Sequence, residues 1–177
     1  MGEADGLDVG DRAPDFEAEL VWPDGGTERV ALSELLSETP VLLAFYTADF
    51  SPDCVIEWCA FRDFDWFASS DAVQVVGISR SNASLHRRFI DFLGLEFPLY
   101  ADPDLAVAEA FDVRYVALKL SARARRSCLL IDRDRTIRYR WLGEHWLDPT
   151  RDTPPVDEIY EAVRAEFGTD AERFGFG

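Results

Sequence analysis

The amino-acid sequence predicts an α/β fold of three layers. Two apolar runs, residues 41–45 and 73–79, have the length and composition of strands that are buried on both faces. Helical patterns follow both runs, and a late pair of apolar segments, 128–131 and 137–142, predicts a hairpin before a final helix. Strands that alternate with helices in this order are typical of a three-layer α/β sandwich.

Start and stop signals delimit the individual elements. Residues 23–26, Pro-Asp-Gly-Gly, predict a turn between two strands. Asn82 suits the N-cap of a helix and Gly94 its C-terminal end, while the pair of prolines before residue 156 starts the last helix. The expected strands are 16–21, 27–31, 41–45, 73–79, 97–102, 128–131 and 137–142, and the expected helices are 32–37, 54–68, 82–93, 104–111 and 156–167. We expect residues 113–125 to form a loop or an irregular strand.

Length and composition indicate one globular domain. The chain has 177 residues, of which 47% are hydrophobic and 13% aromatic, and it shows neither an internal repeat nor a linker. We expect residues 1–10 to form a flexible tail and residues 11–177 a single domain. No stretch approaches the ~20 apolar residues of a membrane span, and the acidic N-terminus has no apolar signal region. We therefore expect a cytoplasmic protein with no membrane partner.

The charge is strongly negative. The net charge is −16, and Lys119 is the only lysine. Such a surface disfavours binding to nucleic acids and anionic membranes, because phosphate binding needs clustered cations. It also suggests adaptation to high salt, where counter-ions screen self-repulsion. GC-rich coding is the alternative explanation for arginine in place of lysine.

Residues 45–63, FYTADFSPDCVIEWCAFRD, carry the candidate chemistry. An apolar strand leads through the Ser51-Pro52 turn into a helical pattern at Cys54, and Cys59 follows five residues later. The first turn of a helix has partial positive charge and unpaired N–H groups, and both favour a thiolate over a thiol. Three cysteines in a chain of cytosolic character favour redox chemistry over a structural disulfide framework. Alternatively, both cysteines serve as small, half-buried apolar residues.

The spacing of the two cysteines has a geometric consequence. In a regular helix, Cys54 and Cys59 are about 7.5 Å apart along the axis and about 140° apart around it. Their Cα atoms are then roughly 8–9 Å apart, whereas a disulfide tolerates about 7 Å. A disulfide between them therefore requires the first turn of the helix to unwind.

This stretch resembles the active-site segment of the peroxiredoxins, the alkyl hydroperoxide reductase and thiol-specific antioxidant family. The resemblance is closest to the peroxiredoxin Q or bacterioferritin comigratory protein branch. The family has a Pro-x-x-x-Thr/Ser-x-x-Cys motif after a strand and a Glu three residues beyond the cysteine, and many members of this branch have a second cysteine five residues on. Ser51, Cys54, Glu57 and Cys59 match these positions, whereas Thr47 stands where the motif has proline.

The resemblance extends over residues 10–167, with weaker matches at 11–16, 76–79 and 101–103. It implies a thioredoxin-like fold with a peroxiredoxin-type N-terminal hairpin and inserted elements.

The resemblance implies a role for each matching residue. Cys54 is the peroxidatic nucleophile, and Cys59 resolves its sulfenic acid as an intramolecular disulfide. Ser51 orients the peroxide or the sulfur, and Thr47 and Pro52 contribute to the substrate pocket. Ser51 is otherwise an ordinary turn or cap serine, and Cys59 a buried core cysteine.

An arginine is also implied beside the thiolate, just before a late core strand. Arg126 matches that position and Arg125 is its neighbour. Glu57 then pairs with this arginine, although both side chains otherwise suit a solvated surface. Cys128 lies in an apolar strand, where we expect a core cysteine.

These features predict a thiol-dependent peroxidase that reduces hydrogen peroxide or organic hydroperoxides and is regenerated by a thioredoxin-like reductant. A redox-sensing protein on the same fold is an alternative, because Thr47 and Asp53 both weaken the usual pocket. A one-cysteine peroxidase resolved by an external thiol is another. We expect no cofactor and no metal, since His86 and His145 lack metal-ligand spacing to the cysteines. We expect the basic residues at 86–88 to form a solvated spot on a helix, and the protein to be a monomer or a homodimer.

Overall fold

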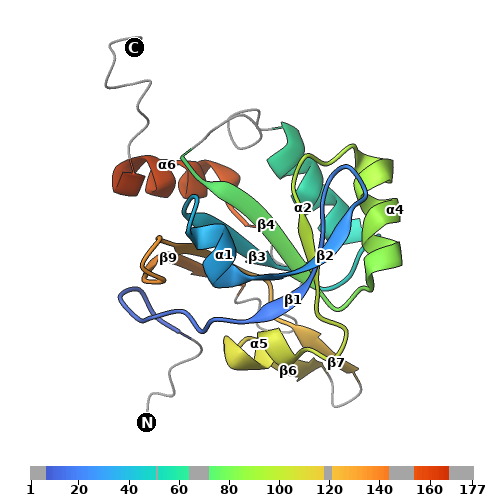
Figure 1. Cartoon of the computed structure of the whole chain (residues 1–177), viewed down its shortest axis with the longest axis horizontal. Helices are drawn as coiled ribbons and strands as arrows, with labels where there is room; N and C mark the ends of the chain where they lie inside the picture. Colours follow the sequence, from blue (N-terminus) through green and yellow to red (C-terminus); the bar gives the residue numbers. More distant parts are fainter. Residues whose placement is uncertain (1–6, 51, 64–71, 118–120, 144–153, 168–177) are drawn as a thin grey trace.

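The computed structural model describes residues 7–50, 52–63, 72–117, 121–143 and 154–167. Its centre is a seven-stranded sheet with the order β2-β1-β5-β4-β3-β8-β9, and helices surround this sheet (Figure 1). The strands of the sheet are β1 (Glu17–Val21), β2 (Thr27–Ala31), β3 (Val41–Phe45), β4 (Gln74–Ser79), β5 (Leu99–Ala101), β8 (Ser127–Ile131) and β9 (Ile137–Leu142). The helices are α1 (Leu32–Leu36), α2 (Pro52–Asp63), α4 (Ala83–Leu93), α5 (Ala106–Ala110) and α6 (Val156–Phe167).

Two hydrophobic cores cover the two faces of the sheet. Successive side chains of a strand point to opposite faces, and the central strand β3 therefore supplies both cores. Val41, Leu43 and Phe45 pack with α1 and α5, whereas Leu42 and Ala44 pack with α2, α4 and α6. Helices on both faces of the sheet confirm the predicted three-layer α/β sandwich.

The sheet register brings two distant segments together at the end of β3. Strand β3 runs parallel to β4 and antiparallel to β8, and Phe45 at its C-terminal end pairs with Ser127 at the start of β8. The residues that follow Phe45 and those that precede Ser127 therefore emerge at the same edge of the sheet. The first of these segments leads into α2, and the second contains Arg126.

Most predicted elements occur within one or two residues of their expected bounds. Asn82 caps α4, since its side chain accepts a hydrogen bond from the backbone N–H of Leu85 at 2.9 Å. Gly94 follows this helix in the left-handed conformation, with φ of 64°. The sequence alone predicted both ends of this helix, because each capping signal acts within a single helical turn.

The bounds of two predicted helices and the character of one predicted segment differ from the structure. Helix α2 starts at Pro52 instead of Cys54, because proline suits the first turn of a helix; the end of the predicted helix lies outside the described residues. Helix α5 is shorter than predicted, because Leu105 adopts a left-handed conformation and Asp102 accepts hydrogen bonds from the first turn. In place of the loop or irregular strand expected within 113–125, β6 (Arg114–Ala117) and β7 (Ser121–Ala124) form a regular antiparallel pair.

Part of the expected N-terminal tail contacts the sheet. The backbone N–H of Gly10 donates to Ile137 at 2.8 Å, and the guanidinium of Arg140 donates to the carbonyl of Leu7 at 3.1 Å. Residues 7–10 are thus held against β9.

None of the helices in the described part of the chain is long and apolar enough to cross a membrane.

Candidate active site

Cys54 lies in the first turn of α2, inside the core. It is the third residue of the helix, and its side chain is 0% exposed. Strand β3 and the loop 46–50 deliver the helix start to the edge of the sheet where β8 begins. The thiol is therefore both at a helix N-terminus and shielded from water, and the groups around it decide its charge.

Arg126 provides the cation beside this sulfur. Its Nη2 lies 2.9 Å from the Sγ of Cys54, and its Nη1 lies 3.3 Å from the Oε2 of Glu57. The side chain is 0% exposed, and its own carbonyl accepts a hydrogen bond from Gly143 at 2.8 Å. A fixed guanidinium favours the thiolate and presents N–H donors to the reacting atoms.

The neighbouring arginine points elsewhere. The Nε of Arg125 donates to the carbonyl of Gly143 at 2.7 Å, and this side chain is only half-buried. Of the two adjacent arginines, Arg126 is the one that contacts Cys54.

Glu57 completes a chain of three ionisable groups, Cys54, Arg126 and Glu57. It lies three residues after Cys54 in α2, a spacing that puts both side chains on one face of the helix, and it is 1% exposed. Burial raises the pKa of Glu57 from 4.5 to about 7, and the positive charge of Arg126 opposes this increase. The carboxyl group of Glu57 and the sulfur of Cys54 thus share one guanidinium.

The other two cysteines occupy different environments. Cys59 is half-buried and packs against the core formed by α2, α4 and α6. Cys128 is buried in β8, opposite Ala44 of β3. Burial raises the pKa of the Cys128 thiol well above its usual value, and Glu57 adds to this effect. None of Cys54, Cys59 and Cys128 forms a disulfide.

The structure describes only part of the predicted catalytic Ser51 and the predicted pocket residues Thr47 and Pro52. Ser51 and the side chain of Pro52 lie outside the described residues. Thr47 follows β3 by two residues, and within the described part of the chain its buried Oγ1 has no hydrogen-bond partner. The threonine that replaces the motif's proline thus introduces a polar atom that has no partner among the described residues.

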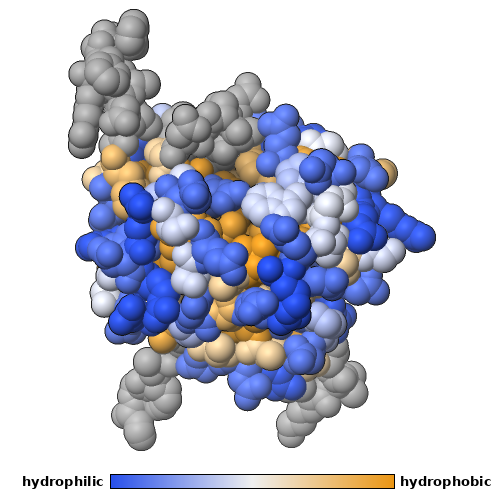
Figure 2. Space-filling model, in the orientation of Figure 1, coloured by the Kyte–Doolittle hydropathy of each residue, from blue (hydrophilic) through white to orange (hydrophobic). Residues whose placement is uncertain are grey.

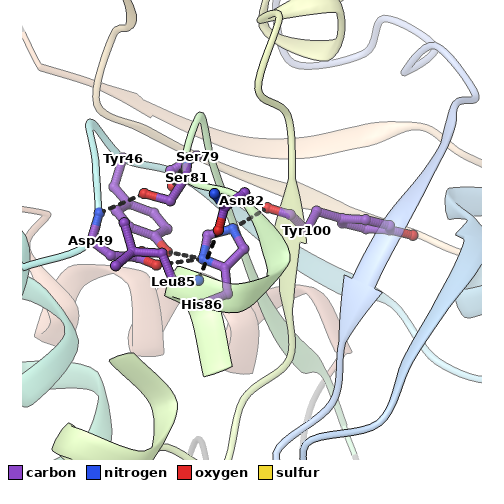
Figure 3. A network of polar contacts seen from close by, with 8 residues as sticks. All are labelled: Tyr46, Asp49, Ser79, Ser81, Asn82, Leu85, His86 and Tyr100. Carbon is purple, nitrogen blue, oxygen red and sulfur yellow. Dashed lines mark hydrogen bonds and ion pairs between the residues drawn. The ribbon is translucent and has the colours of Figure 1, made fainter. Parts of the chain in front are cut away.

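Sequence reasoning missed a buried polar network next to this site (Figure 3). His86 was expected on a solvated face, but it is 0% exposed and its Nδ1 lies 2.7 Å from the Oδ2 of Asp49. Asp49 also accepts a hydrogen bond from the hydroxyl of Tyr46. The prediction was wrong because it considered only the charges at 86–88. The spacing of His86 to Phe89 and Leu93, which are buried in α4, was a signal that could have placed it inside.

Comparisons with known proteins show which family the chain belongs to. The family model described as "AhpC/TSA family" matches residues 9–140. Peroxiredoxin Bcp of Bacillus subtilis (strain 168) is 34% identical over 139 residues, which are 76% of this chain and 85% of the relative. A putative peroxiredoxin of Mycobacterium tuberculosis is 35% identical over 132 residues, which are 74% of this chain and 82% of the relative.

Solved structures give the same result for the fold. Peroxidoxin BcpB from Mycobacterium tuberculosis superposes with a TM-score of 0.72 at 31% identity, over 89% of this chain and 97% of that one. PrxQ of Xylella fastidiosa has a TM-score of 0.71 at 22% identity, over 90% and 96%, and it supports the thioredoxin-like fold alone. With its sequence match and its fold, the chain belongs to the AhpC/TSA family of peroxidase oxidoreductases, in the Bcp or peroxiredoxin Q branch.

Proposed function

We propose that this protein reduces hydrogen peroxide or organic hydroperoxides with Cys54 as the nucleophile. The observation that carries the proposal is the 2.9 Å contact between the Sγ of Cys54 and the Nη2 of Arg126, in a site closed to water. A buried cation next to a sulfur stabilises the thiolate that attacks an O–O bond.

The first step transfers one oxygen to the sulfur. The thiolate of Cys54 attacks the nearer peroxide oxygen, the S–O bond forms and the O–O bond breaks. Cysteine is oxidised by two electrons to a sulfenic acid, and the leaving alkoxide or hydroxide takes a proton to become an alcohol or water. Arg126 supplies N–H donors where negative charge builds on the leaving oxygen. Glu57 holds the other end of the guanidinium at 3.3 Å and thereby fixes its direction.

Cys59 is the proposed resolving thiol. It attacks the sulfenic acid of Cys54, an S–S bond forms, and water leaves. The two residues lie on α2, five positions apart, so the first turn of this helix has to unwind before the sulfurs meet. The partial exposure of Cys59 suits this movement.

A dithiol reductant of the thioredoxin type closes the proposed cycle. Thiol–disulfide exchange transfers two electrons from the reductant, which becomes a disulfide, and restores both thiols. We propose that the protein works in the cytoplasm, in a salt-rich cell and as a monomer or homodimer.

The test is peroxide-dependent oxidation of a thioredoxin and thioredoxin reductase couple, in high salt, by the wild type, Cys54→Ser and Cys59→Ser. We expect turnover by the wild type and none by Cys54→Ser. Cys59→Ser should lose turnover with thioredoxin and form no intramolecular disulfide.

Two other results would redirect the proposal. Turnover of Cys59→Ser with a small thiol at the wild-type rate would indicate a one-cysteine peroxidase. A folded wild type that oxidises once and does not turn over with either reductant would contradict the peroxidase cycle and favour a redox sensor.

A further inference from the structure

The loop between β3 and α2 is tied to α4 through one aspartate. Asp49 is 7% exposed, and its two carboxylate oxygens face different partners (Figure 3). The hydroxyl of Tyr46 donates to Oδ1 at 2.5 Å, and the Nδ1 of His86 lies 2.7 Å from Oδ2. The backbone N–H of Asp49 donates to the Oγ of Ser81 at 3.0 Å. The loop is therefore fixed by both its side chain and its backbone.

The hydrogen-bond partners of His86 determine where its ring carries protons. Its Nε2 lies 2.9 Å from the carbonyl oxygen of Tyr100, which can only accept, so Nε2 carries a proton. The contact between Nδ1 and Asp49 then holds one further proton, on the imidazole or on the carboxyl group. In either arrangement, His86 joins the loop to α4 and to β5.

Aromatic contacts with α4 also hold this loop. Phe50 has a left-handed backbone with φ of 66°, a conformation that non-glycine residues adopt at a cost of about 1 kcal/mol. Its ring packs on Phe89 and Phe92 of α4, with centroid distances of 5.2 Å and 5.6 Å. Helix α4 thus stabilises a loop conformation that has little local preference of its own.

This loop lies next to the proposed nucleophile. Asp49 and Phe50 immediately precede the segment in which α2 and Cys54 begin. The ring of Tyr46 packs edge-on against Trp58, which lies one turn beyond Cys54, with a centroid distance of 5.5 Å. Burial raises the pKa of Tyr46, and Cys54 is among the neighbours that raise it further. The network and the thiol are therefore within electrostatic range of each other.

We infer that His86 is a positioning residue of the peroxidatic site. Through Asp49 it fixes the loop before α2, and so it keeps Cys54 against Arg126 in the folded conformation that reacts with peroxide. This inference rests on the proposed function. The same anchor opposes the unwinding that the disulfide between Cys54 and Cys59 requires. Loosening it therefore slows the oxidation of Cys54 and accelerates the formation of the disulfide.

The experiment follows both steps by stopped-flow fluorescence after mixing reduced protein with hydrogen peroxide. The variants are His86→Ala, Asp49→Ala, their double mutant and the conservative Asp49→Asn. An asparagine still accepts from Tyr46 through its oxygen and donates to the Nδ1 of His86 through its amide.

Two control variants distinguish an effect on the positioning of Cys54 from a general loss of protein stability. Arg88→Ala changes an exposed residue of the same helix, and Val163→Ala removes buried methyl groups from the same core at α6.

We expect both alanine variants to lower the second-order rate constant of oxidation by at least about tenfold and to raise the first-order rate of disulfide formation. The double mutant should lose about as much as either single variant, because the two residues act as one unit. Asp49→Asn should recover most of the oxidation rate, and both controls should react as the wild type does. Loss of stability alone would not produce opposite changes in the two steps.

Several outcomes overturn the inference while leaving the proposed function intact. One is a wild type that reacts with peroxide while both alanine variants react equally fast. Another is an Asp49→Asn variant that is oxidised as slowly as Asp49→Ala. The negative charge of Asp49, and not its hydrogen bonds, would then account for the rate. If His86→Ala does not fold, the two Asp49 variants decide the question. A wild-type Cys54 that does not react with peroxide instead contradicts the proposed function itself.

Discussion

Arg126 contacts two side chains that compete for its charge. The buried guanidinium lies 2.9 Å from the sulfur of Cys54 and 3.3 Å from the carboxyl group of Glu57. With Glu57 protonated, the positive charge is left to the sulfur, whereas an ionised Glu57 takes a share of it. Because burial raises the pKa of Glu57 to about 7, the balance changes near neutral pH.

Glu57→Gln tests this at the residue scale. The native state binds the Glu57 proton more tightly than the unfolded chain, since the pKa rises from 4.5 to about 7. The stability that this proton contributes is complete below the unfolded pKa and is lost as pH rises through about 7. The free energy of unfolding of Glu57→Gln, minus that of the wild type, should therefore increase by more than about 1 kcal/mol between about pH 5 and pH 8.

Urea unfolding at several pH values measures this difference, with the exposed Glu96→Gln as control. A difference that does not vary with pH would contradict the raised pKa of Glu57.

Thr47→Val tests the unpaired hydroxyl at the position where the family has proline. Valine has nearly the same shape, and it removes a buried Oγ1 that has no partner among the described residues. We expect the free energy of unfolding to rise by about 1 kcal/mol, because an unsatisfied buried polar group is costly. Thr47→Ser keeps the hydroxyl and serves as the control in urea unfolding. A less stable valine variant would show that the hydroxyl has a partner in solution.

Local patterns predicted some of these residues and not others. The strand, the turn and the helix around Cys54 are adjacent in sequence, and a local pattern therefore indicates them. The contact of Cys54 with Arg126 spans 72 positions, and only the family resemblance pointed to it. The pairing of Asp49 with His86 spans 37 positions, and no short-range rule joins two such segments. Such contacts are set by strand order and register.

At the scale of the elements, the packing of α2 on the sheet depends on a residue of β4 that has no side chain. Gly77 of β4 has no side chain, and a Cβ there would lie 2.5 Å from Cζ2 of Trp58 and 2.6 Å from Cδ2 of Leu99. The indole of Trp58 is 0% exposed, and it occupies the space over this glycine. The close approach of α2 to the sheet, and with it the place of Cys54, requires glycine at this position.

Gly77→Ala should therefore destabilise the protein by about 1–3 kcal/mol, because the added methyl group overpacks the core. Trp58→Phe in the same chain should recover part of that loss, since a phenyl ring lacks the crowding atoms. Urea unfolding of the two single variants and the double variant measures the recovery. If the losses of unfolding free energy in the two single variants simply add in the double variant, the indole of Trp58 is not the source of the clash.

The sequence did not predict the strands β6 and β7 as a regular pair. The segment 113–125 lacks a turn signal of the kind found at residues 23–26. Among the described strands, β6 and β7 pair with each other and with no strand of the main sheet. The late hairpin β8–β9, by contrast, is anchored by β3, and the continuous apolar run of β8, which is buried along its whole length, indicated a strand.

At the scale of the whole molecule, the net charge of −16 should make stability depend on salt. Hydrophilic residues cover much of the face in Figure 2, with an apolar strip through its middle. Raising KCl from about 0.05 M to about 1 M shortens the Debye length to about 3 Å and screens the repulsion among surface carboxylates. We expect the melting temperature to rise by several degrees.

Thermal unfolding monitored by circular dichroism measures this, with sorbitol at equal osmolality as control. An equal rise in sorbitol would indicate solute exclusion instead of charge screening. A melting temperature that is constant in KCl would show that the acidic surface is not a source of instability.

The complete burial of Cys54 has a consequence for how the protein meets foreign thiol reagents. A small oxidant can enter the folded structure, and its rate is then limited by chemistry. A bulky alkylating agent or disulfide has to wait until the structure opens, so different bulky reagents should converge on one common rate. The half-buried Cys59 is available to them sooner. The fold therefore selects reagents by size before their reactivity matters, and only the smallest should reach the proposed nucleophile Cys54 without an opening of the structure.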